Sequence, residues 1–229
     1  MITIEKIQKR YGNNIVLSID QLEIKAGECF GLVGNNGAGK TTLFSLILDL
    51  IKPTNGEVSS KSVNVAASEE WKNYTGSYLD EGFLIDFLTP DEYFNFIGKI
   101  HGLNRVDLNN FLDQYREFFN DEIIGKKKYL RDLSKGNQKK VGLIASLIGN
   151  PEVLILDEPF ANLDPSSQIR LKRLINDLPD HMTIIISSHD LNHVTEVCDR
   201  IVVLDKGEVV KDLHRSEETL KELETYFTV

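Results

Sequence analysis

The sequence predicts an α/β fold, in which helices wrap a mainly parallel β-sheet and a helical lobe is inserted into it. Three observations support this prediction. Short apolar strands alternate with helices at both ends of the chain, as in sheets with crossover helices. A glycine-rich loop at 34–41 joins a strand to a helix, and between 88 and 150 the apolar spacing becomes helical throughout.

The first part of the chain reads as strands followed by one helix. Residues Ile2–Ile7 and Val16–Ile24 alternate between apolar and polar, and Glu28–Val33 is a short apolar run that enters the glycine-rich loop. After the loop, apolar residues at helical spacing predict a helix over Thr41–Ile51, which Pro53 and the following Asn and Gly end.

The middle of the chain predicts three helices. Residues 89–92 (Thr-Pro-Asp-Glu) form a capping box with Pro at the first helical position, and Gly102 closes this helix. A second helix is expected over Val106–Phe119, and a third from Ser134 to just before Pro151.

The last part returns to alternating strands and helices. In order, we expect a strand at Val153–Leu156, a helix opened by Asp164 and Pro165, a strand at Met182–Ser187, a helix capped by Asp190, and a hairpin of Ile201–Leu204 with Glu208–Asp212. The chain is therefore divided into an α/β core with a β subdomain (1–87 and 151–229) and a helical subdomain (88–150).

Composition excludes several classes of protein. Of 229 residues, 41% are hydrophobic and 27% charged, which argues against wholesale disorder. The net charge of −9 disfavours broad adhesion to nucleic acid, so no nucleic-acid partner is expected. Two cysteines do not make a disulfide scaffold. No apolar stretch approaches the roughly 20 residues of a membrane span, and the first ten residues do not form a secretory signal, so we expect an intracellular protein.

The glycine-rich loop fits the P-loop pattern, with the residues Gly34-Asn35-Asn36-Gly37-Ala38-Gly39-Lys40-Thr41. Glycines let backbone N–H groups face a phosphate, and the following helix adds a partial positive charge at its N-terminus. Lys40 is expected to reach the β- and γ-phosphates, and the Thr41 hydroxyl to hold Mg²⁺. The alternative is an ordinary glycine-rich turn, which the strand–loop–helix context disfavours.

Two further motifs carry possible chemistry. The strand 153–156 ends in Asp157, which would face the Mg²⁺ held by Thr41, and Glu158, which suits a general base that activates water. Alone, the two acids could simply end a buried strand in solvent. Ser134 opens a helix at 133–138 as an N-cap, and on composition alone this capping role needs no ligand.

Taken together, these motifs resemble the ATP-binding cassette (ABC) ATPases. The resemblance rests on Gly34–Thr41, Leu133–Gln138, Val153–Glu158, Asn162-Leu163-Asp164 and His189, in this order and spacing. It implies the nucleotide-binding subunit of a bacterial ABC transporter: a RecA-like P-loop NTPase core with an antiparallel β subdomain and an inserted α-helical subdomain.

The resemblance also implies roles for single residues. Tyr11 takes the place of the aromatic that stacks on adenine. The loop from Gly34, with Thr42, binds phosphates and magnesium. Asp157 assists the ion, Glu158 is the catalytic base, and His189 senses the γ-phosphate.

A second group of residues is implied to act across a dimer. The signature residues Ser134, Lys135, Gly136 and Asn137 touch the ATP held by the opposite subunit, and Asp164 lies in a loop that crosses the interface. The usual LSGGQ is LSKGN here. The loop that normally carries a magnesium-sensing glutamine falls at residues 77–82, where Glu81 takes that place, and Asn35 stands where many relatives have proline.

The function we predict is an ATPase subunit that dimerises around two ATP, with itself or a paralogue, and energises a separate multi-span permease at the inner face of the cell membrane. Some of the residues Phe83–Phe87 are expected to be exposed to receive that permease. One alternative is a soluble ABC-type ATPase not linked to transport, although such proteins usually carry two cassettes or a coiled-coil insertion. Another is a nucleotide-binding regulator that does not hydrolyse ATP, against which Glu158 and His189 argue.

Overall fold

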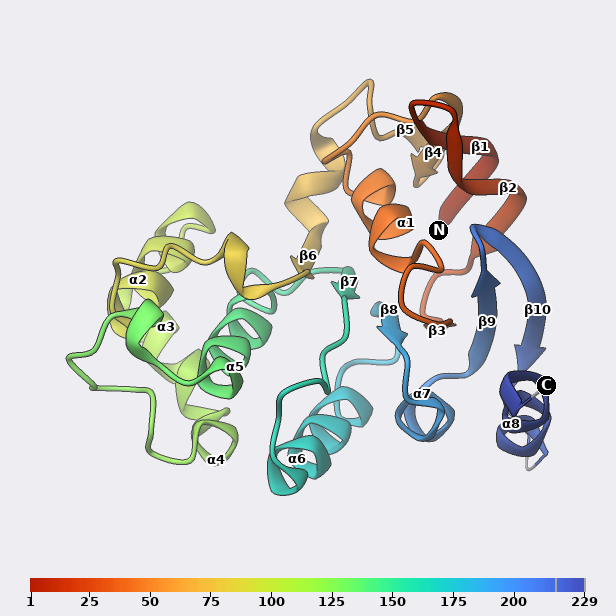
Figure 1. Ribbon diagram of the computed structural model, residues 1–229. Helices are drawn as coiled ribbons and strands as arrows, with labels where there is room; N and C mark the ends of the chain where they lie inside the picture. The colour runs from red at the N-terminus through yellow and green to blue at the C-terminus, as the bar shows by residue number, and fades with distance from the viewer. Residues whose placement is uncertain (217, 229) are drawn as a thin grey trace.

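A six-stranded sheet forms the centre of the computed structural model, which describes residues 1–216 and 218–228 (Figure 1). The strand order is β10-β9-β3-β8-β7-β6, in which only β10 runs antiparallel to its neighbour. The strands are β3 (Cys29–Val33), β6 (Thr75–Tyr78), β7 (Val153–Leu156), β8 (Thr183–Ser188), β9 (Arg200–Asp205) and β10 (Glu208–His214). All residues of β7 and β8 are buried, as expected for parallel strands covered on both faces.

A second sheet of four antiparallel strands lies beside the first, in the order β2-β1-β4-β5. It comprises β1 (Ile2–Tyr11), β2 (Asn14–Ile24), β4 (Asn55–Ser60) and β5 (Val63–Asn64). Its apolar face packs with α1 and one face of the central sheet around a shared core that includes Ile4, Phe30 and Phe44. This shared core fixes the small sheet beside the loop between β3 and α1.

The helices fall into two groups. Those near the sheets are α1 (Lys40–Ile47), α6 (Pro165–Asn176), α7 (Leu191–Val197) and α8 (Thr219–Thr228). The lobe drawn at the left of Figure 1 holds α2 (Pro90–Ile100), α3 (Arg105–Asp113), α4 (Arg116–Phe119) and α5 (Lys135–Ala145). Single 3-10 turns are η1 (Glu70–Tyr74), η2 (Glu81–Phe83) and η3 (Leu130–Asp132). The fold class is confirmed: a P-loop NTPase core, an antiparallel β subdomain and an inserted helical lobe.

The structure differs from the sequence prediction in several elements. The helix predicted to reach Ile51 ends at Ile47, and Asp49 takes a left-handed backbone with φ of 49°. The single helix predicted over 106–119 is two helices, because helical structure is interrupted after Asp113. The second of them, α4, places Phe118 and Phe119 in the core. Strands β4 to β6 and helix α8 were not predicted.

None of the helices in the described ranges is long and apolar enough to cross a membrane.

Candidate functional site

The turn between β3 and α1 lines a cavity that has features of an anion site. Gly37 and Gly39 have φ of 85° and 109°, a region that favours glycine, and a Cβ added at Gly37 would point into open space. Helix α1 has no side-chain cap at its N-terminus, so its first N–H groups are left for an anion. The cavity measures 270 Å³ and is lined by Val16, residues 36–42 and Glu158.

Among the described residues that line this cavity, Lys40 is the one with an ammonium group. Its side chain is 7% exposed, and its Nζ donates a hydrogen bond of 2.7 Å to the carbonyl oxygen of Gly34. The same Nζ lies 3.4 Å from Oε1 of Glu158. The cation is therefore buried between the loop and the carboxylate, where a bound phosphate would compete for it.

Asp157 follows β7 and connects three elements. Its carboxylate accepts hydrogen bonds from the Thr41 hydroxyl at 2.5 Å and from the Ser187 hydroxyl. Burial raises the pKa of Asp157 above its ordinary value, although both hydroxyls act in the opposite direction. Thr41 at the start of α1 and Asp157 at the end of β7 thus lie in direct contact.

This pair fits an ion that is held mainly by a substrate. Across residues 1–216 and 218–228 there is no group of three or more His, Cys, Asp or Glu side chains that could hold a metal. Mg²⁺ typically takes only one or two protein oxygens and completes its shell with phosphates and water. A hydroxyl and a carboxylate at the edge of a phosphate-sized cavity match that donor set.

Glu158 is oriented by the end of β8. Its backbone N–H donates to the Ser187 hydroxyl at 2.9 Å, and its φ is 47°. Its Oε2 lies 2.8 Å from Nδ1 of His189 and accepts the backbone N–H of His189 at 3.3 Å. The structure therefore brings together Lys40, Glu158 and His189, three residues predicted for this site.

Two other predicted site residues lie differently. The Tyr11 ring, at the end of β1, is 55% exposed and is not among the residues that line the cavity, although the neighbouring strand β2 contributes Val16. Oε1 of Glu81 accepts the Tyr78 hydroxyl at 3.0 Å and lies 3.9 Å from Nζ of Lys139. Among the described residues, Glu81 has these two side-chain contacts and none with Asp157.

The signature residues lie at the N-terminus of α5 and do not line the cavity of their own chain. The Ser134 hydroxyl accepts the Asn137 N–H at 3.2 Å, and the Asn137 amide donates to Glu122 at 3.0 Å. Lys135 is exposed. A Cβ at Gly136 would lie 2.9 Å from the carbonyl oxygen of Asn162, so only glycine fits there without a shift.

Asp164 caps α6 close to this helix end. Its carboxylate accepts the Ser166 hydroxyl at 2.6 Å and the hydroxyl and N–H of Ser167 at 2.6 and 3.0 Å. These bonds hold the pKa of Asp164 well below its usual range, with the Ser166 hydroxyl as the largest cause.

Sequence reasoning missed two residues of the site. Ser187 was predicted only as the last residue of a strand, yet it bonds both Asp157 and Glu158. Its position two residues before His189 at the end of a buried strand was the available signal. Lys139 donates to the carbonyl oxygen of Glu158 at 2.8 Å, and its position in a lysine pair on a helix gave no such signal.

Comparisons with known proteins identify the family to which the chain belongs. The family model described as ABC transporter matches residues 17–161. An uncharacterized ABC transporter ATP-binding protein of Methanocaldococcus jannaschii is 36% identical over 212 residues, which cover 91% of this chain and 76% of that protein. A solved ATP-binding subunit of an ABC transporter superposes with a TM-score of 0.87 at 25% identity, covering all of both chains.

A further solved structure is CbiO1 of Clostridium perfringens, described as part of the ABC transporter complex CbiONQ. It superposes with a TM-score of 0.77 at 26% identity and covers 100% of this chain and 93% of that one. The chain therefore belongs to the ABC transporter family, as an ATP-binding subunit that hydrolyses ATP to energise transport.

Proposed function

We propose that the chain binds ATP with Mg²⁺ at residues 34–42 and hydrolyses it with Glu158 as the general base. One observation carries this assignment: Lys40, Thr41 and Glu158 line one cavity of 270 Å³ at an edge of the sheet. Asp157 bonds Thr41 and His189 bonds Glu158 directly beside it. A general base needs to lie within reach of a water beside the γ-phosphate, and Glu158 is the carboxylate that lines this cavity.

Each residue has a role that its contacts support. Lys40 would exchange its bond to Gly34 for the β- and γ-phosphates, and the loop N–H groups would hold the remaining oxygens. Thr41 and Asp157 would hold Mg²⁺, which when bound neutralises charge on the phosphates. His189, 2.8 Å from Glu158, would orient that carboxylate and contact the γ-phosphate. Tyr11 would stack on adenine from the exposed end of β1.

We also propose that two cassettes close face to face, so that residues 134–137 of one chain complete the ATP site of the other. Within one chain these residues do not line the P-loop cavity. Gly136 lies close to the carbonyl oxygen of Asn162 in the loop that leads to Asp164, so we expect the signature and this loop to meet the second cassette together. The second cassette is a copy of this chain or a paralogue.

Glu158→Gln tests both proposals. Loss of the base should slow hydrolysis by about 10²–10⁴ while ATP binding persists. Removal of a negative charge beside the γ-phosphate should also stabilise the closed dimer, since like charges meet there. Hydrolysis, fluorescent-ATP binding and size-exclusion chromatography with ATP measure the three effects. Full hydrolysis would remove Glu158 as the base, and a slow but strictly monomeric variant would contradict the dimer.

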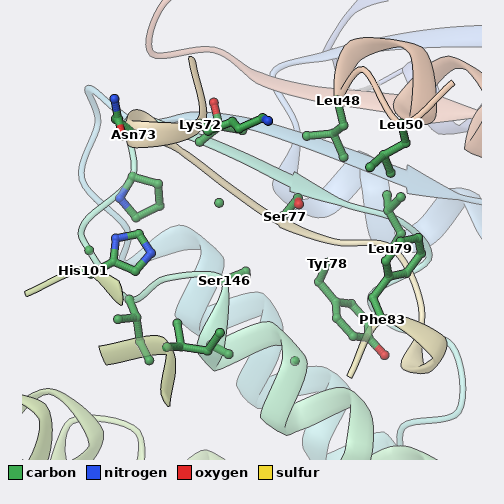
Figure 2. Close-up of a pocket in the computed structure, with 18 of the residues that line it drawn as sticks. Leu48, Leu50, Lys72, Asn73, Ser77, Tyr78, Leu79, Phe83, His101 and Ser146 are labelled. Atoms are coloured by element: carbon green, nitrogen blue, oxygen red, sulfur yellow. The ribbon is translucent and has the colours of Figure 1, made fainter. Parts of the chain in front are cut away.

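The membrane partner is proposed to dock in a groove between the core and the helical lobe. This groove is a cavity of 400 Å³. It is lined by residues from the turn after α1, from β6 and η2, and from α2 and α5. Phe83 and Leu50 in its wall are 59% and 50% exposed, and Phe87 nearby is 62% exposed. Figure 2 shows Leu50, Tyr78 and Phe83 at one end of this groove and His101 at the other. A groove with exposed apolar side chains such as Phe83 and Leu50 in its wall suits a short helix of a permease.

A photo-crosslinking residue at position 83, introduced in cells that express the chain with its transporter, tests this groove. The expected adduct is a multi-span membrane protein. The matched control is position 106, because Val106 is 67% exposed on α3 and does not line the groove. Equal adducts at the two positions, or none at position 83, would remove the groove as the docking surface.

Docking on a permease would hold the chain at the inner face of the cell membrane. A soluble ATPase without a transport role is not favoured, because the matched relatives bear the names of transporter subunits.

A further inference from the structure

We propose that Lys139 is a positioning residue for ATP hydrolysis, which holds the backbone of Glu158 and is itself held by Glu81 and Tyr78. The inference rests on the proposed role of Glu158 as general base. Lys139 lies on α5, five residues after Ser134, yet its ammonium reaches the end of β7 in the core. The helix that begins with the signature thus also contacts the base of its own chain.

The hydrogen bond from Lys139 stabilises an unfavourable backbone conformation at Glu158. Nζ of Lys139 donates to the carbonyl oxygen of Glu158 at 2.8 Å. With φ of 47°, Glu158 occupies the left-handed region, which is costly for a residue with a Cβ. The Ser187 hydroxyl holds its N–H, and the Ala161 N–H reaches the same carbonyl at 3.2 Å. Lys139 is the charged donor among these three groups, and it comes from a different subdomain.

The ammonium is fixed by its own surroundings. Its side chain is 5% exposed, and a buried ammonium requires partners. Oε1 of Glu81 lies 3.9 Å from Nζ, and the Tyr78 hydroxyl donates to the same Oε1 at 3.0 Å. Burial lowers the pKa of Lys139, while Glu81, followed by Glu158, acts to raise it.

Packing leaves this arrangement little freedom. A Cβ added at Gly142, three residues after Lys139 on α5, would lie 2.2 Å from the Tyr78 ring. The helix therefore sits directly on Tyr78, whose hydroxyl orients Glu81. In this view the carboxylate at the glutamine position acts on the reaction through Lys139, rather than by contacting the metal.

Lys139→Met tests the proposal, with Lys140→Met as the matched control. Lys140 is equally buried on the same helix, at 4% exposure, but its Nζ lies over the Phe118 ring, 5.7 Å from its centre. Lys139→Met should lower kcat by about 10- to 100-fold, because a misplacement of about 1 Å can cost about 100-fold. Affinity for a fluorescent non-hydrolysable ATP should be unchanged. The control should keep kcat even if its melting temperature falls.

Two further variants sharpen the test. Lys139→Gln keeps an N–H donor without the charge, so its kcat should lie between those of wild type and Lys139→Met. In a Glu81→Gln, Lys139→Met double variant, kcat should equal that of Lys139→Met alone. If the double variant instead loses kcat by the product of the losses in Glu81→Gln alone and in Lys139→Met alone, Glu81 acts independently of Lys139 and that part of the proposal is wrong.

A readout without nucleotide separates this inference from the proposed function. In the free chain, the ¹³Cα and ¹³Cβ shifts of Glu158 should leave their left-handed values in Lys139→Met and keep them in Lys140→Met. Unchanged shifts with unchanged kcat would overturn the role of Lys139. A wild-type chain that neither binds nor hydrolyses ATP would instead contradict the proposed function, while the shifts would still decide on Lys139.

Discussion

The N-termini of α1 and α5 are both proposed to meet a phosphate, but they are capped differently. Helix α1 begins at Lys40 after Gly39, whose backbone is left-handed, and no side chain caps it. Helix α5 begins after Ser134, whose hydroxyl accepts the Asn137 N–H. At the first helix end no side-chain cap occupies the N–H donors, which lie beside a lysine and two acids. At the second, the Ser134 hydroxyl already accepts one donor, the Asn137 N–H.

This difference fits the half of the ATP site that we propose for each helix. At α1, the donors, the cation and the oxygens proposed to hold Mg²⁺ lie within one chain, so we expect nucleotide to bind to a single copy. At α5, the serine stabilises the helix without any ligand, and in the proposed dimer it would become part of an ATP site only when a second chain approaches. Changes at the two ends should therefore fail in different assays.

The largest expected effect is at α1. Within residues 1–216 and 218–228, Lys40 is the one side-chain cation that lines the cavity, and Lys40→Ala removes it. A hydrogen bond to a charged group contributes about 1.5–3 kcal/mol. Fluorescent-ATP affinity should therefore fall by at least roughly tenfold. Lys126→Ala, in an exposed turn, is the control and should bind as wild type. Near-native affinity of Lys40→Ala would show that residues 34–41 are not the site.

A smaller effect is expected at α5. Ser134→Ala removes a cap, which costs about 0.5–2 kcal/mol of stability, and should leave ATP affinity of the single chain unchanged. The corresponding cap of α2 is Thr89, whose hydroxyl accepts the Glu92 N–H at 3.3 Å, and Thr89→Ala removes it. The melting temperature should fall by a similar amount in both variants, but the rate of ATP hydrolysis should fall only in Ser134→Ala. Equal hydrolysis rates in the two variants would show that Ser134 acts only as a helix cap.

The contrast between the two helix ends also separates what the sequence predicts from what it does not. The P-loop, Asp157 and Glu158 were predictable because local patterns encode them: glycines at fixed spacing, and two acids after a buried strand. The cap at Ser134 was equally local. Its proposed role in another chain's site came from resemblance alone, since no local sequence pattern indicates an intermolecular contact.

Other features depend on contacts between distant segments. Strand β4 has a single buried apolar residue, Val58, so its sequence pattern does not predict a strand. Pairing of Val58 with Ile4 in β1 determines the strand instead. Lys139 looks like a solvated helix residue until the fold places Glu158 and Glu81 beside it. In both cases the deciding partner lies more than 15 residues away in the chain.

A mixing experiment tests most directly whether α5 of one chain completes the site at α1 of the other. Ser134→Arg chains should bind ATP but not hydrolyse it, and Lys40→Ala chains should do neither, so each alone is inactive. In a mixed dimer, the Lys40 site of the first chain faces the intact Ser134 of the second. The account predicts that hydrolysis returns in such mixed dimers, at one site of two. Verified mixed dimers that stay as inactive as either parent, or a Ser134→Arg chain that hydrolyses ATP at the wild-type rate, would contradict it.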